Sequence, residues 1–187
     1  MLSIMAGFLV GMGATIYLTL GGITGALFFS LGLTTIVIFR FNLFTGKAGL
    51  YADGKISFIE LLGMWFGNYV GAMFAAIAAS VLPQAEKIVT GSQAIIQTRC
   101  GNPPLVNFIL GAMCGLLMYI AVTGFSKTGS YLFLIAPVAF FILVGYNHCI
   151  ADMFYSTLGT NKIWELKPLI YTTAGNFLGA NVIPLIN

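Results

Sequence analysis

One short phrase occurs twice in this chain, each time inside an apolar stretch. Residues 67–72 read GNYVGA, and residues 175–180 read GNFLGA, 108 positions later. The glycine and asparagine that begin each copy are costly inside an apolar helix. Glycine weakens the helix, and the amide of asparagine needs a hydrogen-bond partner that hydrocarbon does not supply. The return of this phrase in the second half of the chain therefore predicts an internal duplication.

Composition places the duplicated chain in a membrane. Apolar residues make up 59% of the 187 residues and charged residues only 7%, with a mean hydropathy of +0.98. Soluble domains carry about 25% charged residues. The net charge of +3 is small and scattered, which excludes a basic surface for nucleic acid. Duplicated halves with a substrate site between them are typical of membrane transporters and channels.

Nothing in the pattern of reactive residues indicates an enzyme. Cys100, Cys114 and Cys149 show no CxxC or CxxH spacing, so they predict neither a metal site nor a disulfide framework. One histidine and five acidic residues form no recognisable catalytic set. We therefore expect no enzymatic activity, no metal and no cofactor.

Six apolar stretches come near the length of about 20 residues that spans a bilayer. They cover residues 4–20, 24–39, 57–82, 104–125, 130–146 and 168–186. The second and fifth are short, and each runs into a polar segment, RFNLFTGK at 40–47 and GYNHCIADMF at 145–154. Broken helices at corresponding places in two halves are a sequence indication of a binding site, so we expect breaks near 40–46 and 147–152.

The repeat extends to these breaks and divides the chain. NLF at 42–44 aligns with DMF at 152–154 at nearly the same offset as the GN phrase. We expect one transmembrane channel domain over residues 1–187, with halves at about 1–82 and 100–187. Three spans per half force opposite insertion, which predicts an all-α, 3+3 inverted repeat. Segment 83–103 is predicted to be the connecting loop, because it contains or adjoins the helix breakers Pro83, Gly91, Gly101, Pro103 and Pro104.

Several motifs, taken in order, resemble those of the formate/nitrite transporter family. The matching segments cover nearly the whole chain and are FSLGL at 29–33, LFT at 43–45, FGNYVGA at 66–72, PVA at 137–139, GYNH at 145–148, IA at 150–151 and GN at 175–176. The resemblance implies an aquaporin-like fold with broken second and fifth helices. It also implies a homopentamer in which every protomer has its own pore for small monovalent anions.

The same resemblance assigns roles to individual residues. The central pore histidine corresponds to His148, the threonine of the broken second helix to Thr45, and the pore-lining asparagine of the last helix to Asn176. Arg99 stands at the position of a lysine that precedes the fourth helix. Two apolar constrictions flank the centre of the pore and correspond to Phe29, Leu33, Leu43, Phe44 and Phe141.

This chain departs from the family pattern at three of its polar positions. Arg99 replaces the lysine, Asn147 stands where many relatives have a glutamate, and Asp152 stands where asparagine is usual. Arginine keeps the charge of lysine but presents it as a planar fork. A carboxylate is thus lost beside His148 and another appears four residues later. These residues complete the expected pore and substrate site, with the electrostatics around the histidine changed.

The chemistry of a single intramembrane histidine supports an anion path without the family argument. A small anion does not cross hydrocarbon, because its desolvation is too costly, but a weak acid avoids that cost by accepting a proton or a strong hydrogen bond. Histidine, with an unperturbed pKa of about 6.5, can supply the proton or the hydrogen bond near neutral pH. We expect a channel for formate, nitrite, hydrosulfide or a similar anion, with or without protons, in the inner membrane of a prokaryote. The alternative is a pore for water, glycerol or ammonia.

Overall fold

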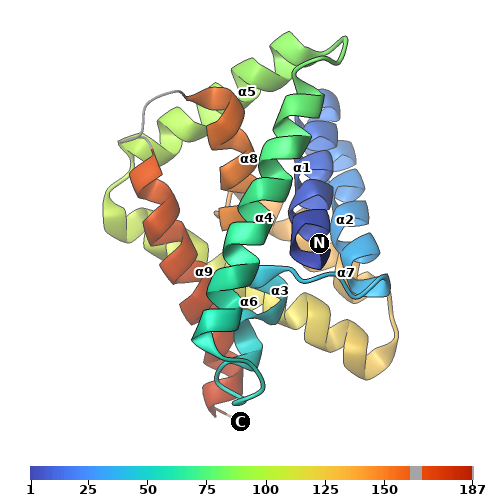
Figure 1. The fold of residues 1–187 in the computed structure, drawn as a ribbon, viewed down its shortest axis with the longest axis vertical. Helices are drawn as coiled ribbons and strands as arrows, with labels where there is room; N and C mark the ends of the chain where they lie inside the picture. The colour runs from blue at the N-terminus through green and yellow to red at the C-terminus, as the bar shows by residue number, and fades with distance from the viewer. Residues whose placement is uncertain (161–165, 187) are drawn as a thin grey trace.

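The protein is a bundle of helices in the computed structural model, which describes residues 1–160 and 166–186 (Figure 1). The elements, in chain order, are α1 (Leu2–Leu20), α2 (Gly22–Ile38), α3 (Phe44–Lys47), the 3-10 turn η1 (Ala48–Leu50), α4 (Phe58–Ala79), α5 (Ala85–Gly101), α6 (Pro104–Thr128), α7 (Leu132–Val144), α8 (Cys149–Gly159) and α9 (Lys167–Ile186). The expectation of an all-helical protein is confirmed for these residues.

Helices α1, α4, α6 and α9 are each long and apolar enough to cross a membrane. Helices α7 and α8 pass the same test only together, as a pair bent by 49°. Helix α2 is apolar but has 17 residues, which is short for a full span. By length and composition, the described residues therefore supply four spans, or five with the bent pair, and six spans stay a prediction.

The structure has a helix break at each of the two predicted places, with shifted boundaries. Helix α2 ends at Ile38 and α3 begins at Phe44, so the first break covers 39–43. The second covers 145–148, and the expectation that it reaches residue 152 is wrong. Gly145 ends α7 in the left-handed conformation, at φ 81°, which glycine adopts without strain. His148 caps α8 by accepting the backbone N–H of Ala151, so the helix restarts earlier than expected.

The expectation of a connecting loop over residues 83–103 is also wrong, because most of this segment forms α5. Its prolines, Pro83 and Pro103, flank the helix rather than interrupt it. Ile88, Ser92 and Ile96 recur every four residues and are buried, so they form one packed face. That face lies toward α8 and α1, and α5 runs obliquely across the upper part of the bundle in Figure 1.

Two close helix crossings hold the breaks in place. Helix α1 packs on α4, and α6 packs on α9. A Cβ atom at Gly7 would collide with the carbonyl oxygen of Asn68, and one at Gly115 would collide with that of Asn176. The two glycines lie 108 positions apart, like the two asparagines. The backbones thus touch in the same way at both crossings.

Candidate functional site

Asn68 of α4 holds the first break by three hydrogen bonds to main-chain atoms. Its side-chain oxygen accepts the backbone N–H of Phe44 at 2.8 Å. Its amide nitrogen donates to the carbonyl oxygens of Ser3, at 2.7 Å, and Asn42, at 2.8 Å. The side chain is fully buried, so each of these bonds replaces one that hydrocarbon does not offer. Asn68 therefore joins α1, the break and α3.

Asn176 of α9 repeats this arrangement at the second break. Its side-chain oxygen accepts the N–H of Cys149 at 2.8 Å, and its amide nitrogen donates to Gly111 O at 2.7 Å and Asn147 O at 2.8 Å. Asn176 is fully buried, and these bonds occupy its amide. The structure thus places Asn176 behind the break, where it supports the main chain.

The two breaks bring Thr45 and His148 into contact. Thr45 Oγ1 and His148 Nε2 lie 2.9 Å apart, although the residues are 103 positions apart in sequence. His148 Nδ1 accepts the backbone N–H of Ala151 at 3.2 Å, so the neutral ring carries its proton on Nε2. Nε2 then donates to the threonine oxygen, which leaves the Thr45 hydroxyl hydrogen free to donate further. Both residues are buried.

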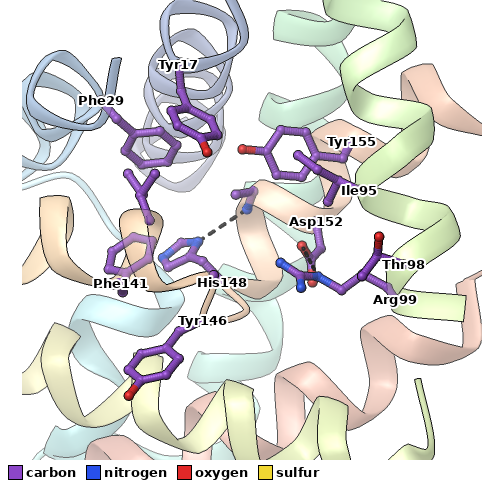
Figure 2. A pocket seen from close by; sticks show the side chains of 13 residues that line it. Tyr17, Phe29, Ile95, Thr98, Arg99, Phe141, Tyr146, His148, Asp152 and Tyr155 are labelled. Carbon is purple, nitrogen blue, oxygen red and sulfur yellow. Dashed lines mark hydrogen bonds and ion pairs between the residues drawn. The ribbon is translucent and has the colours of Figure 1, made fainter. Parts of the chain in front are cut away.

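Aromatic rings close the space beside His148 (Figure 2). Phe141 stacks on the imidazole with ring centroids 5.6 Å apart and an interplanar angle of 11°. Phe29 meets Phe141 edge to face, with centroids 6.1 Å apart. We call Phe29 and Phe141 the aromatic neck. Phe29 of α2 and Phe141 of α7, two of the five predicted constriction residues, thus meet next to His148.

Two cavities lie at successive turns of α2. The His148 cavity, of about 180 Å³, is lined by the aromatic neck, His148, Arg99, Asp152 and several tyrosines. The Lys47 cavity, of about 280 Å³, is lined by Leu33, Leu43, Arg40, Lys47 and further apolar side chains. Leu33 and Leu43 therefore line a different cavity from Phe29 and Phe141, and a constriction at these leucines stays a prediction.

Four predicted site residues line neither cavity: Thr45, described above with His148, and Phe44, Asn147 and Asn176. Phe44 lines a separate apolar cavity of about 370 Å³ with Trp65 and Phe177. Asn147 is fully buried, and its amide nitrogen donates to Asn107 Oδ1 at 3.1 Å and Thr172 Oγ1 at 3.4 Å. Asn176 faces the main chain, as described above. Phe44, Asn147 and Asn176 thus belong to the hydrogen-bonded support of the breaks and not to the lining of the two cavities.

Sequence reasoning missed other cavity residues. Tyr17 and Tyr155 reach the His148 cavity from α1 and α8, and Figure 2 shows both rings beside the neck. Nothing in their sequence setting distinguishes them from other tyrosines. Arg40 and Lys47 line the second cavity, and their position within the polar segment 40–47 was a usable signal. Each cavity thus contains at least one permanent cation.

Arg99 and Asp152 form an ion pair in the wall of the His148 cavity. Arg99 Nε lies 3.6 Å from Asp152 Oδ1, and only 12% and 3% of the two side chains are exposed. Arg99 comes from the end of α5, and Asp152 comes from the first turn of α8. In the described residues, no three His, Cys, Asp or Glu side chains gather in a way that would hold a metal ion.

Comparison with known proteins places this architecture in a family. The model of the formate/nitrite transporter family matches residues 1–186. The nitrite transporter NirC of Escherichia coli K12 is 34% identical, over 97% of this chain and 74% of its own length. The formate channel FocA of Haemophilus influenzae is 28% identical, over 87% and 67%.

A solved structure supports the same assignment. A pentameric formate channel with formate bound superposes with a TM-score of 0.80 at 28% identity, over 97% of this chain and 91% of that one. The fold, the order of the sequence motifs and the family match over nearly every residue agree with one another. This protein therefore belongs to the formate/nitrite transporter family.

Proposed function

We propose that this protein is a membrane channel that passes small monovalent anions of weak acids, such as formate, nitrite or hydrosulfide. The observation that carries the proposal is the Thr45–His148 hydrogen bond behind the aromatic neck, between two cavities that contain cations. Relatives that are named for formate and nitrite support this substrate class. We place the protein in the inner membrane of a prokaryote as a homopentamer with one pore per protomer, after the pentameric formate channel it resembles.

The two halves, at about 1–82 and 100–187, form one domain with a 3+3 inverted repeat in this proposal. The matching hydrogen bonds of Asn68 and Asn176 support it, because each asparagine binds the break of its own half. The break at 39–43 belongs to one half, and the break at 145–148 to the other. Thr45 and His148 therefore meet at the junction of the halves, where substrate sites of duplicated transporters lie.

The chain of donors at the neck suits an anion. The N–H of Ala151 donates to His148 Nδ1, His148 Nε2–H donates to Thr45, and the Thr45 hydroxyl is left to donate to a substrate. Hydrogen bonds in such a chain polarise one another and strengthen the last donor. Burial excludes water from the site, so these donors replace the hydration of the anion. Protonation of His148 Nδ1 would break the bond from Ala151 and so change this chain of donors, which makes the anion site sensitive to pH.

A flux panel in proteoliposomes tests this function. Wild type should pass formate, nitrite and hydrosulfide at rates that depend on pH, and should exclude larger solutes. His148→Asn keeps a neutral donor but removes titration between about pH 5 and 8. We expect this variant to lose the part of the pH dependence that its histidine supplies, and to pass chloride more freely. Liposomes without protein supply the background, since weak acids also cross bare lipid.

Two outcomes would contradict the proposal. An unchanged pH profile in His148→Asn would remove the histidine from the mechanism and leave a pore that selects by size. Permeability to water, glycerol or ammonia without anion flux would favour the neutral-solute alternative. Native mass spectrometry of the detergent-solubilised protein checks the pentamer separately, because a different mass would overturn the assembly without touching the pore.

A further inference from the structure

The His148 cavity contains a carboxylate as well as a cation, which is unexpected in the path of an anion. Among the acidic residues in the described ranges, only Asp152 is buried, whereas Asp53, Glu60 and Glu86 are exposed. A buried, ionised carboxylate repels a permeating anion unless a cation compensates its charge. Arg99, on the neighbouring helix α5, is the cation that the structure pairs with it.

The pairing of Arg99 with Asp152 is electrostatic and leaves hydrogen-bonding capacity unused. The 3.6 Å separation of Arg99 Nε and Asp152 Oδ1 exceeds a normal hydrogen bond. Neither carboxylate oxygen of Asp152, nor Arg99 Nε, has a hydrogen-bond partner among the described residues. The two side chains therefore neutralise each other loosely, without the close fork-to-carboxylate geometry that makes such pairs strong.

His148 does not take up the charge of Asp152 through a direct bond. Its Nδ1 accepts from Ala151 and its Nε2 bonds Thr45, so both ring nitrogens are occupied. Figure 2 shows the Asp152 carboxylate turned toward the Arg99 guanidinium, to one side of the imidazole ring. The electrostatic partner that remains for Asp152 in this cavity is Arg99.

We propose that Asp152 is a resident counter-anion of Arg99, and that an anion in the His148 cavity competes with it for the guanidinium. The inference rests on the proposed function as an anion channel and adds a specificity-determining residue to it. The Asp152 carboxylate has the same planar pair of oxygens as formate and nitrite. An anion that displaces Asp152 can align two oxygens with the guanidinium fork, a geometry that Asp152 itself does not reach, so the cavity favours planar two-oxygen anions over spherical ones such as chloride.

The competition has a measurable consequence. An anion that binds Arg99 must weaken the hold of Asp152, so the carboxylate lowers the affinity of the cavity and eases release. Removal of its charge should tighten formate binding by about tenfold, a modest share of the interaction between two charges about 4 Å apart at a protein surface. Tighter binding slows release, so the maximal flux should fall in the same variant.

Formate titration into the purified protein, followed by calorimetry, tests the competition without relying on conduction. Asp152→Asn should lower the dissociation constant for formate by about tenfold, and Arg99→Gln should abolish that gain when the two changes are combined. Arg99→Lys keeps the charge and removes the fork, so it should bind chloride and formate with similar affinity. A melting curve shows whether Asp152→Asn folds. If it folds poorly, Arg99→Lys provides the test in its place.

Different outcomes separate this inference from the proposed function. If wild type conducts anions, and Asp152→Asn binds formate as wild type does, the counter-anion role is overturned and the channel stands. The inference would also be overturned if Asp152→Asn raised formate affinity equally in the Arg99→Gln background. The charge of Asp152 would then affect binding without Arg99. If wild type neither conducts anions nor binds formate, and Asp152→Asn does not bind it either, both proposals fail.

Discussion

The two helix breaks have the same support but carry different chemistry. In each, a buried asparagine accepts the N–H of the first residue of the next helix and donates to a carbonyl oxygen within the break. The helices that follow differ, because α3 has 4 residues and α8 has 11. The first break presents a hydroxyl, on Thr45, and the second presents an imidazole, on His148.

This difference indicates that the support and the chemistry of the site are separable. Each asparagine bonds only main-chain atoms, and a glycine at the facing helix lets the backbones touch. The side chains of Thr45 and His148 take no part in the asparagine bonds, although His148 also accepts the N–H of Ala151 at the start of α8. Helix α8 is also long enough to carry a second polar residue of the cavity, Asp152, whereas α3 ends after one turn.

The largest expected effect comes from breaking the support at either asparagine. Asn68→Leu and Asn176→Leu keep the volume but leave three main-chain groups without partners. At about 1–3 kcal/mol for each buried group, either variant should lose about 5 kcal/mol. Melting temperature and yield of the detergent-purified protein measure it. If the two breaks are equivalent, the losses should match, and a tolerant Asn176→Leu beside an unstable Asn68→Leu would break the comparison.

An intermediate effect is expected at the aromatic neck, to which each half contributes one ring. Phe29→Ala and Phe141→Ala should each lower stability by about 3–5 kcal/mol, the usual range for removing a buried phenylalanine. Both should also admit larger solutes such as lactate, because the edge-to-face contact is lost. Liposome flux of lactate against formate measures the selectivity. Folded variants with wild-type selectivity would show that these rings are not the filter.

A smaller effect is expected from removing one main-chain bond of the second break. Cys149 is the first residue of α8 and gives its N–H to Asn176. Proline is tolerated at this position of a helix, and His148 already has the extended conformation that a following proline requires. Cys149→Pro should therefore cost about 1–3 kcal/mol, chiefly through the lost N–H bond. Cys149→Ala is the matched control, and equal melting temperatures for both would contradict main-chain support.

Sequence reasoning reached the class of fold because its signals were local or periodic. The repeated GN phrase located Asn68 and Asn176, and the family resemblance is confirmed by the match over residues 1–186. Sequence did not reveal which way an amide turns. Asn176 was expected to contact the pore, whereas its amide bonds main-chain groups behind the break. The direction of the Asn176 amide depends on how α6, α8 and α9 pack together. The spacing of residues within one helix does not reveal that packing.

The errors at α5 and at the second break have a common physical origin. The glycines and prolines of segment 83–103 predict a loop, but Pro83 and Pro103 lie outside α5. At the second break, the polar run predicts an interruption near 147–152, whereas α8 already begins at Cys149. His148 instead caps α8 with its ring, an option that composition does not reveal. In both cases, a residue that favours a helix end over a helix interior lies just outside the helix.

The main-chain character of the supports has a consequence for the evolution of substrate choice. Asn68 and Asn176 recognise peptide groups that every residue except proline possesses. The side chains of the break can therefore be replaced without redesign of what holds them, and a new substrate can be acquired by a few point changes. Paralogues with different cargoes on one unchanged framework are the expected result.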